Sequence, residues 1–179
     1  DEKWLRRCLD SVRYQTYDNW ELCIADDASP EPRVREVLKE YEALDPRIRV
    51  VYRNKNGHIS EASNSALEIA KGEFVALLDH DDELSDQALF RMVEELNLHP
   101  DAVVLYSDED KIDMHGRRSQ PHFKPDWDPE LMCSINLVTH FSMFRTATLK
   151  AIGGFRSAFD GSQDYDLTLR AVETASPNQ

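Results

Sequence analysis

Hydrophobic positions along the first 110 residues alternate between helical and strand spacing in a regular order. The opening stretch DEKWLRRCLDSV repeats apolar residues every three or four positions, which predicts an amphipathic helix already under way at its first residue. In WELCIA, apolar residues alternate with more polar ones, which predicts a strand. The series continues as a helix over 32–44, a strand over 48–52, a helix over 61–71 capped by Ser60, a continuous apolar strand over 73–79, a helix over 85–99 and a strand over 102–110.

This alternation of helices and strands predicts an α/β domain with a mostly parallel central sheet flanked by helices. In such sheets, ligands bind beyond the carboxyl ends of the strands. Acidic residues follow three of the four predicted strands, at Asp26–Asp27, Asp79–Asp82 and Asp108–Asp110. We therefore expect the strand ends to meet in one acidic rim.

The second part of the chain has a different character. Residues 111–129 are rich in Pro, His, Asp and Gly, and a strand in NLVTHFSMF, a short helix in TATLKAIGG and a last helix in SQDYDLTLRAVE follow. We expect a single domain over 1–179, with a nucleotide-binding half over 1–110 and an acceptor-binding half over 111–179. Both ends are abrupt, so we expect the chain to be cut from a longer domain.

Composition narrows the function classes. The net charge of −13 offers no basic excess for nucleic acid, although a bound divalent metal would still admit an anionic substrate. Three cysteines without a CxxC pair indicate a reducing compartment, and no apolar run approaches the roughly 20 residues that span a bilayer. The glycine-rich fingerprints of dinucleotide enzymes and P-loop proteins are absent from the sequence.

The stretch LLDHDDEL gathers four acids where an apolar strand ends. Two such charges about 5 Å apart repel by roughly 3 kcal/mol at an effective dielectric of about 20. Alternate positions of an extended segment point the same way, so Asp79 and Asp81 can reach one site. Their oxygens suit Mg²⁺ or Mn²⁺. The alternative is an exposed acidic turn that opens the next helix.

Other polar residues have two interpretations each. Asp26 and Asp27 can accept hydrogen bonds from a base or ribose, or serve turn geometry. Asn56 and Gly57 form a turn or border a ligand. Asn64 lies inside a helix, where asparagine is a poor helix former, which hints at a polar contact.

The second half offers one candidate base and three weaker candidates for acceptor binding. Asp164 opens the last helix, where a carboxylate can act as a general base or simply favour the helix N-terminus. Asp108 lies in an acidic segment that binds the acceptor or forms a solvated loop. Trp127 and His140 contact a sugar or pack.

Taken together, these stretches resemble the family 2 glycosyltransferases, the large inverting group with the GT-A fold. The matching pieces, in order, are LRRCLDSVRYQTYDNWELCIADDAS, RNKNGHISEASNSALEIAKGEFVALLDHDDELS and GGFRSAFDGSQDYDLTLR. The segments SDEDKID, FKPDWDPELM and GSQDYDL are most similar to bacterial members that build surface polysaccharides, including O-antigen and rhamnose-containing glycans.

The resemblance implies roles for individual residues. The nucleotide would lie against Asp26, Asp27, Asn56, Gly57 and Asn64. Asp79 would contact the ribose or the metal shell, and Asp81 would bind the Mn²⁺ or Mg²⁺ that bridges the diphosphate. Asp164 would take a proton from the acceptor hydroxyl as that oxygen displaces the nucleoside diphosphate, with inversion at the anomeric carbon.

The implied donor is a UDP- or dTDP-sugar, and the implied acceptor is a saccharide or a lipid-linked glycan. We expect a cytoplasmic protein, with peripheral association at the inner membrane face. Gln163 stands where many members have Glu. The family's first strand would precede Asp1, and a histidine that completes the metal site in many members would follow Gln179. Two other classes stay open: a non-catalytic nucleotide-sugar or glycan-binding module, and a Mg²⁺ phosphotransferase with an Asp nucleophile.

Overall fold

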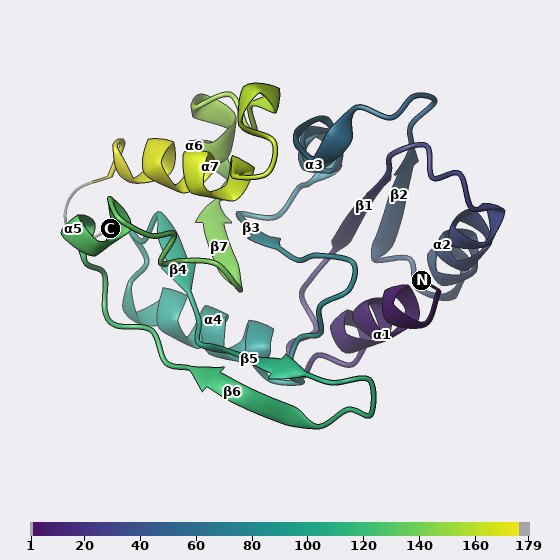
Figure 1. Cartoon of the computed structure of the whole chain (residues 1–179), viewed down its shortest axis with the longest axis horizontal. Coiled ribbons are helices and arrows are strands. Elements are labelled where there is room, and N and C mark those ends of the chain that lie inside the picture. Colours follow the sequence, from purple (N-terminus) through teal and green to yellow (C-terminus); the bar gives the residue numbers. More distant parts are fainter. Residues whose placement is uncertain (1, 176–179) are drawn as a thin grey trace.

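A computed structural model describes residues 2–175 and shows a mixed α/β molecule (Figure 1). In chain order the first part comprises α1 (Glu2–Arg13), β1 (Leu22–Asp26), α2 (Pro32–Leu44), β2 (Ile48–Tyr52), α3 (His58–Ile69), β3 (Phe74–Leu77), α4 (Ala88–Leu98) and β4 (Val104–Tyr106). The second part comprises β5 (Glu109–Ile112), β6 (Arg118–His122), α5 (Pro129–Met132), β7 (Ser142–Arg145), α6 (Thr146–Ala151), the 3-10 turn η1 (Ser157–Phe159) and α7 (Gln163–Val172). The alternation predicted for the first 110 residues is confirmed.

The strands form three hydrogen-bonded groups. β1 and β2 are parallel, in a register that places Leu22 opposite Ile48. β7 lies between β3 and β4 and is antiparallel to both, so β3 and β4 run in the same direction. Within each group the strands of the first part are therefore parallel, and β7 is an antiparallel addition from the second part.

β5 and β6 form an antiparallel hairpin in the region expected to be irregular. Its turn contains Gly116, whose φ of +81° favours glycine. The strand residues are largely exposed and polar, so they lack the apolar alternation from which a strand is normally predicted.

Helix α3 begins earlier than predicted. It starts at His58, so Ser60 lies inside the first turn and is not the cap. Ser60 is fully buried, and its Oγ donates a hydrogen bond to the Arg156 carbonyl. The Ser60 backbone N–H donates to Asp160 Oδ1 at 3.3 Å, so a carboxylate from the second half satisfies this helix terminus.

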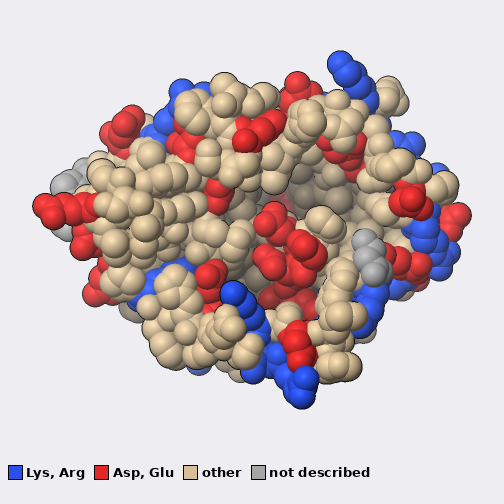
Figure 2. Space-filling model, in the orientation of Figure 1, with Lys and Arg blue, Asp and Glu red and all other residues tan. Residues whose placement is uncertain are grey.

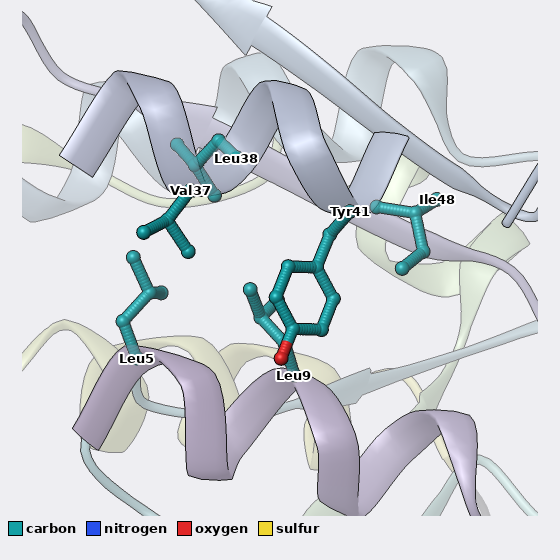
Figure 3. Close-up of a cluster of buried hydrophobic side chains, with 6 residues drawn as sticks. All are labelled: Leu5, Leu9, Val37, Leu38, Tyr41 and Ile48. Atoms are coloured by element: carbon teal, nitrogen blue, oxygen red, sulfur yellow. The ribbon is translucent and has the colours of Figure 1, made fainter. Parts of the chain in front are cut away.

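The helix faces bury the residues that the periodicity indicated. Between α1, α2 and the β1–β2 pair lies a cluster of six buried side chains: Leu5, Leu9, Val37, Leu38, Tyr41 and Ile48 (Figure 3). Burying one such side chain stabilises the fold by about 1.5–3 kcal/mol. The β3–β7–β4 group has its own core, centred on Phe144, which is completely buried. Within residues 2–175, no helix combines the length and apolar character needed to cross a membrane.

A gap separates the two strand groups. Among the described residues, β1 pairs only with β2 and β3 pairs only with β7, so each has one edge without a strand partner. A cavity of about 870 Å³ extends between these edges and is lined by residues of both strands. The same cavity reaches Asp79, which follows β3, and Asp164, in the first turn of α7.

Candidate functional site

Two carboxylates and one imidazole meet just beyond the end of β3. One ligand atom from each of Asp79, Asp82 and His140 can be chosen so that all three lie within 4.8 Å of one another. Acidic side chains gather around the central hollow on this face of the molecule (Figure 2). The structure thus brings the acidic stretch after β3 together with a residue from the loop before β7.

The membership of this cluster differs from the sequence prediction. We expected an extended segment, in which Asp79 and Asp81 point the same way. Instead the chain turns, with the Asp82 backbone N–H donating to the Asp79 carbonyl at 3.2 Å. A turn brings positions i and i+3 together, so Asp82 joins Asp79, and Asp81 lies outside the group of three.

The electrostatic environment of the cluster favours the binding of a cation. Burial raises the pKa of the Asp82 carboxyl, and the charges of Asp79, Asp81 and Glu109 add to this, while His140 opposes it. Burial also raises the pKa of the Cys8 thiol to about 12, and the neighbouring acids contribute. A cation would relieve this crowding of like charges.

The donor set fits a divalent transition metal. Carboxylate oxygens suit Mg²⁺ and Mn²⁺, and an imidazole nitrogen is a ligand for transition metals. The group of Asp79, Asp82 and His140 therefore offers ligand atoms suited to a divalent cation. The further histidine that the resemblance places beyond Gln179 lies outside the described residues.

The predicted base lies in the first turn of α7 and faces the same cavity. Asp164, Gln163, Thr139, His140 and Asp79 all contribute to its lining. Asp164 Oδ2 accepts hydrogen bonds from Asn136 Nδ2 at 2.7 Å and from Thr139 Oγ1 at 2.5 Å. The cavity thus joins a carboxylate capable of accepting a proton to a cluster capable of binding a cation.

Three residues predicted to border the nucleotide are in mutual contact. Both carboxylate oxygens of Asp27 accept from the Gly57 backbone N–H at 3.0 Å, and Asn56 Nδ2 donates to the Asp27 carbonyl at 3.1 Å. Arg53 Nε lies 2.7 Å from Asp27 Oδ1. The ends of β1 and β2 therefore form one polar corner.

The sequence profile described as "Glycosyl transferase family 2" matches residues 1–159. The chain belongs to glycosyl transferase family 2. Over its whole length it is 50% identical to the uncharacterized protein y4gI of Sinorhizobium fredii, covering 20% of that protein. Over 98% of its length it is 41% identical to the O-antigen biosynthesis protein RfbC of Myxococcus xanthus, covering 14% of that protein. Over 96% it is 31% identical to the chondroitin synthase of Escherichia coli, covering 25% of it. The chain thus spans a quarter or less of these relatives.

Solved structures show the same fold. The TarS 1–349 structure of S. aureus in complex with UDP-GlcNAc matches with a TM-score of 0.76 at 22% identity, over 95% of this chain and 50% of TarS 1–349. The mannosyltransferase PcManGT of Pyrobaculum calidifontis, in complex with GDP-Man and Mn²⁺, matches with a TM-score of 0.73 at 18% identity, over 97% of this chain and 49% of that one. The predicted GT-A fold and membership of family 2 are confirmed.

Two of the predicted nucleotide residues of this family 2 domain are engaged inside the protein. Asp26 has a fully buried carboxylate that pairs with Arg35 Nε at 2.6 Å and accepts from the Ser29 backbone N–H. Burial opposes its ionisation, but these partners outweigh it and lower its pKa. Asn64 bonds both ways to the Phe155 backbone, at 2.9 and 2.8 Å. The polar contact suggested for Asn64 is thus with protein backbone.

The three acceptor candidates lie in different surroundings. Asp108 Oδ1 accepts from the Lys124 backbone N–H at 2.8 Å, which ties β5 to the segment after β6. Trp127 packs against the cluster of Met132, Leu137 and Val138. His140 belongs to the cation-binding group described above. Their assignment to acceptor binding stays a prediction.

Sequence reasoning missed Asn136, Thr139 and Arg53, although all three contact predicted site residues. Asn136 and Thr139 lie in NLVTH, which was assigned to a strand by its apolar content. In the structure this segment is a loop, and β7 begins only at Ser142. The polar residues at both ends of the segment were the sequence feature that could have indicated a loop.

Proposed function

We propose that the chain is the donor-binding and catalytic domain of an inverting, metal-dependent glycosyltransferase. It moves a sugar from a nucleotide-diphosphate sugar to a hydroxyl of a glycan or lipid-linked acceptor. The observation that supports this most directly is the single cavity lined by both Asp79 and Asp164. Relatives named for O-antigen biosynthesis and chondroitin synthesis favour a role in bacterial cell-surface polysaccharide synthesis.

The chemistry follows from the two sides of the cavity. Asp164 accepts the proton of the acceptor hydroxyl while that oxygen attacks the anomeric carbon. The attack comes from the face opposite the leaving nucleoside diphosphate, so the anomeric configuration inverts. Asp79, Asp82 and His140 would hold Mn²⁺ or Mg²⁺, which supplies positive charge that stabilises the leaving diphosphate.

The polar corner of Asp27, Asn56 and Gly57 is proposed to hold the base of UDP or dTDP. Asp27 keeps acceptor capacity because a carboxylate offers about four lone-pair positions. Solved structures of the fold are complexes with UDP-GlcNAc and with GDP-Man, so the fold accommodates nucleotide sugars of more than one kind. Cytoplasmic location is part of the same proposal, because nucleotide sugars are cytoplasmic, and a lipid-linked acceptor would place the protein at the inner membrane face.

The first experiment is calorimetric titration of UDP and dTDP into the protein, with Mn²⁺ and with EDTA. We expect metal-dependent binding of one nucleotide, strongly weakened in Asp82→Asn and unchanged in the control Asp101→Asn, whose side chain is exposed and outside the cluster. Equal binding with Mn²⁺ and with EDTA would contradict the metal assignment.

Asp164→Asn separates the enzyme from a non-catalytic binding module. In a transferase this variant binds the donor like the wild type but releases no nucleotide from it. A module without activity would show no turnover in either protein. A phosphotransferase is less favoured, because its nucleophilic Asp usually ends the first strand, whereas the acidic stretch here follows β3.

A further inference from the structure

The carboxylate of Asp164 is held by two side chains of the loop before β7. Asn136 Nδ2 and Thr139 Oγ1 both donate to Asp164 Oδ2, at 2.7 and 2.5 Å. Asn136 Nδ2 also lies 2.6 Å from Thr139 Oγ1. The three side chains therefore close a ring of hydrogen bonds.

The chemistry of the groups fixes the direction of each bond. An ionised carboxylate only accepts, so the single hydroxyl proton of Thr139 goes to Asp164. The hydroxyl oxygen is then free to accept from Asn136, whose amide has two N–H groups and serves both partners. The opposite amide orientation would set Asn136 Oδ1 against the carboxylate oxygen, so the assignment follows from the network.

Both donors form their hydrogen bonds with the same oxygen of Asp164, Oδ2. Within residues 2–175 no protein group donates a hydrogen bond to Oδ1. The backbone of this turn is also secured, since Thr168 Oγ1 donates to the Asp164 carbonyl at 2.8 Å. The ring thus fixes the plane of the carboxylate and leaves one oxygen for a ligand.

The loop that holds Asp164 also reaches the acidic cluster. His140 follows Thr139, and its backbone N–H donates to Glu109 Oε2 at 2.6 Å. Lys124 Nζ donates to the His140 carbonyl at 2.6 Å. One short segment, fixed on both sides, therefore sets the spacing between the proposed base and the cation-binding group.

We propose that Asn136 and Thr139 are positioning residues for glycosyl transfer, which orient Asp164 so that Oδ1 meets the acceptor hydroxyl. The proposal rests on the proposed function, because it takes Asp164 as the general base. A misplacement of about 1 Å in such a group costs on the order of 100-fold in rate. Because Asn136 and Thr139 bond to each other and to Asp164, we expect donor affinity to survive their loss.

The test compares Thr139→Val, Thr139→Ser and Asn136→Ala with the wild type. Nucleotide release is measured with UDP-N-acetylglucosamine, UDP-glucose and dTDP-rhamnose, with water as the acceptor. We expect Thr139→Val and Asn136→Ala to lower kcat by about 10- to 100-fold with an unchanged KM for the donor. Thr139→Ser keeps the hydroxyl and should restore kcat. Ser134→Ala, at an exposed position of the same loop, is the control.

Three results would overturn the proposal: wild-type kcat in Thr139→Val, a Thr139→Ser variant as slow as Thr139→Val, or a loss confined to KM or to the melting temperature. If Asp164→Asn is inactive while Thr139→Val is normal, positioning fails and the proposed function stands. If Asp164→Asn turns over like the wild type, or the wild type releases no nucleotide from any of the three donors, both fail.

Discussion

Replacing Asp82 by Asn tests the idea that the acidic cluster is built for a cation. A carboxylate oxygen of Asp82 lies within 4.8 Å of a carboxylate oxygen of Asp79. Asp82 Oδ2 lies 4.0 Å from His140 Nδ1. Its side chain is 48% exposed. Burial raises its pKa, and the charges of Asp79, Asp81 and Glu109 act in the same direction against the attraction of His140. The metal-free protein therefore keeps a carboxylate that is unfavourable to ionise.

The size of this penalty follows from the geometry. Two carboxylates about 5 Å apart repel by roughly 3 kcal/mol at a dielectric of about 20, and water around a half-exposed group reduces this to about 1 kcal/mol. In EDTA at about pH 7.5, Asp82→Asn should thus raise the melting temperature by roughly 2–4 °C. Because the pKa of Asp82 is raised in the folded protein, its ionised carboxylate destabilises the fold at pH values above that pKa. The difference between the two proteins should shrink as the pH falls through the raised pKa of Asp82 towards the ordinary Asp pKa of about 4.

Mn²⁺ should reverse the order of the two proteins. At a concentration of about 100 times Kd, a ligand stabilises the folded state by about 2.7 kcal/mol, and Asp82→Asn should lose most of this gain. Scanning calorimetry with EDTA and with Mn²⁺ measures both effects, with Asp101→Asn as the matched control. A variant that melts below the wild type in EDTA, or gains as much as the wild type from Mn²⁺, would refute the reasoning.

Three further substitutions separate stability from binding. Asn64→Ala should lower the free energy of unfolding by about 2 kcal/mol in urea titrations, because the Phe155 backbone loses both hydrogen bonds, while the nucleotide affinity of the folded protein stays unchanged. Phe144→Ala empties a fully buried site in the central strand β7, so urea unfolding should show a loss of about 3–5 kcal/mol. Gly57→Ala would set a Cβ against the side-chain ends of Glu61 and Arg53; because Arg53 pairs with Asp27 in the polar corner, we expect calorimetry to show roughly tenfold weaker nucleotide binding, about 1.4 kcal/mol.

The regular part of the fold was predictable because its signals are local. The apolar face of α1 follows directly from helical spacing, and Leu5, Cys8, Leu9 and Val12 are buried as expected. The position of β7 between β3 and β4 could not be predicted in this way. Pairing joins Phe74 to Arg145, residues far apart in the chain, and periodicity carries no information about such partners.

The candidate site was predictable in composition but not in detail. The acidic stretch after β3 was identified from the sequence, yet the choice between Asp81 and Asp82 depends on whether the backbone is extended or turned. The contact between His140 and this stretch depends on the loop before β7. That loop is placed by Glu109 and Lys124 from two other segments, so it is a product of tertiary structure.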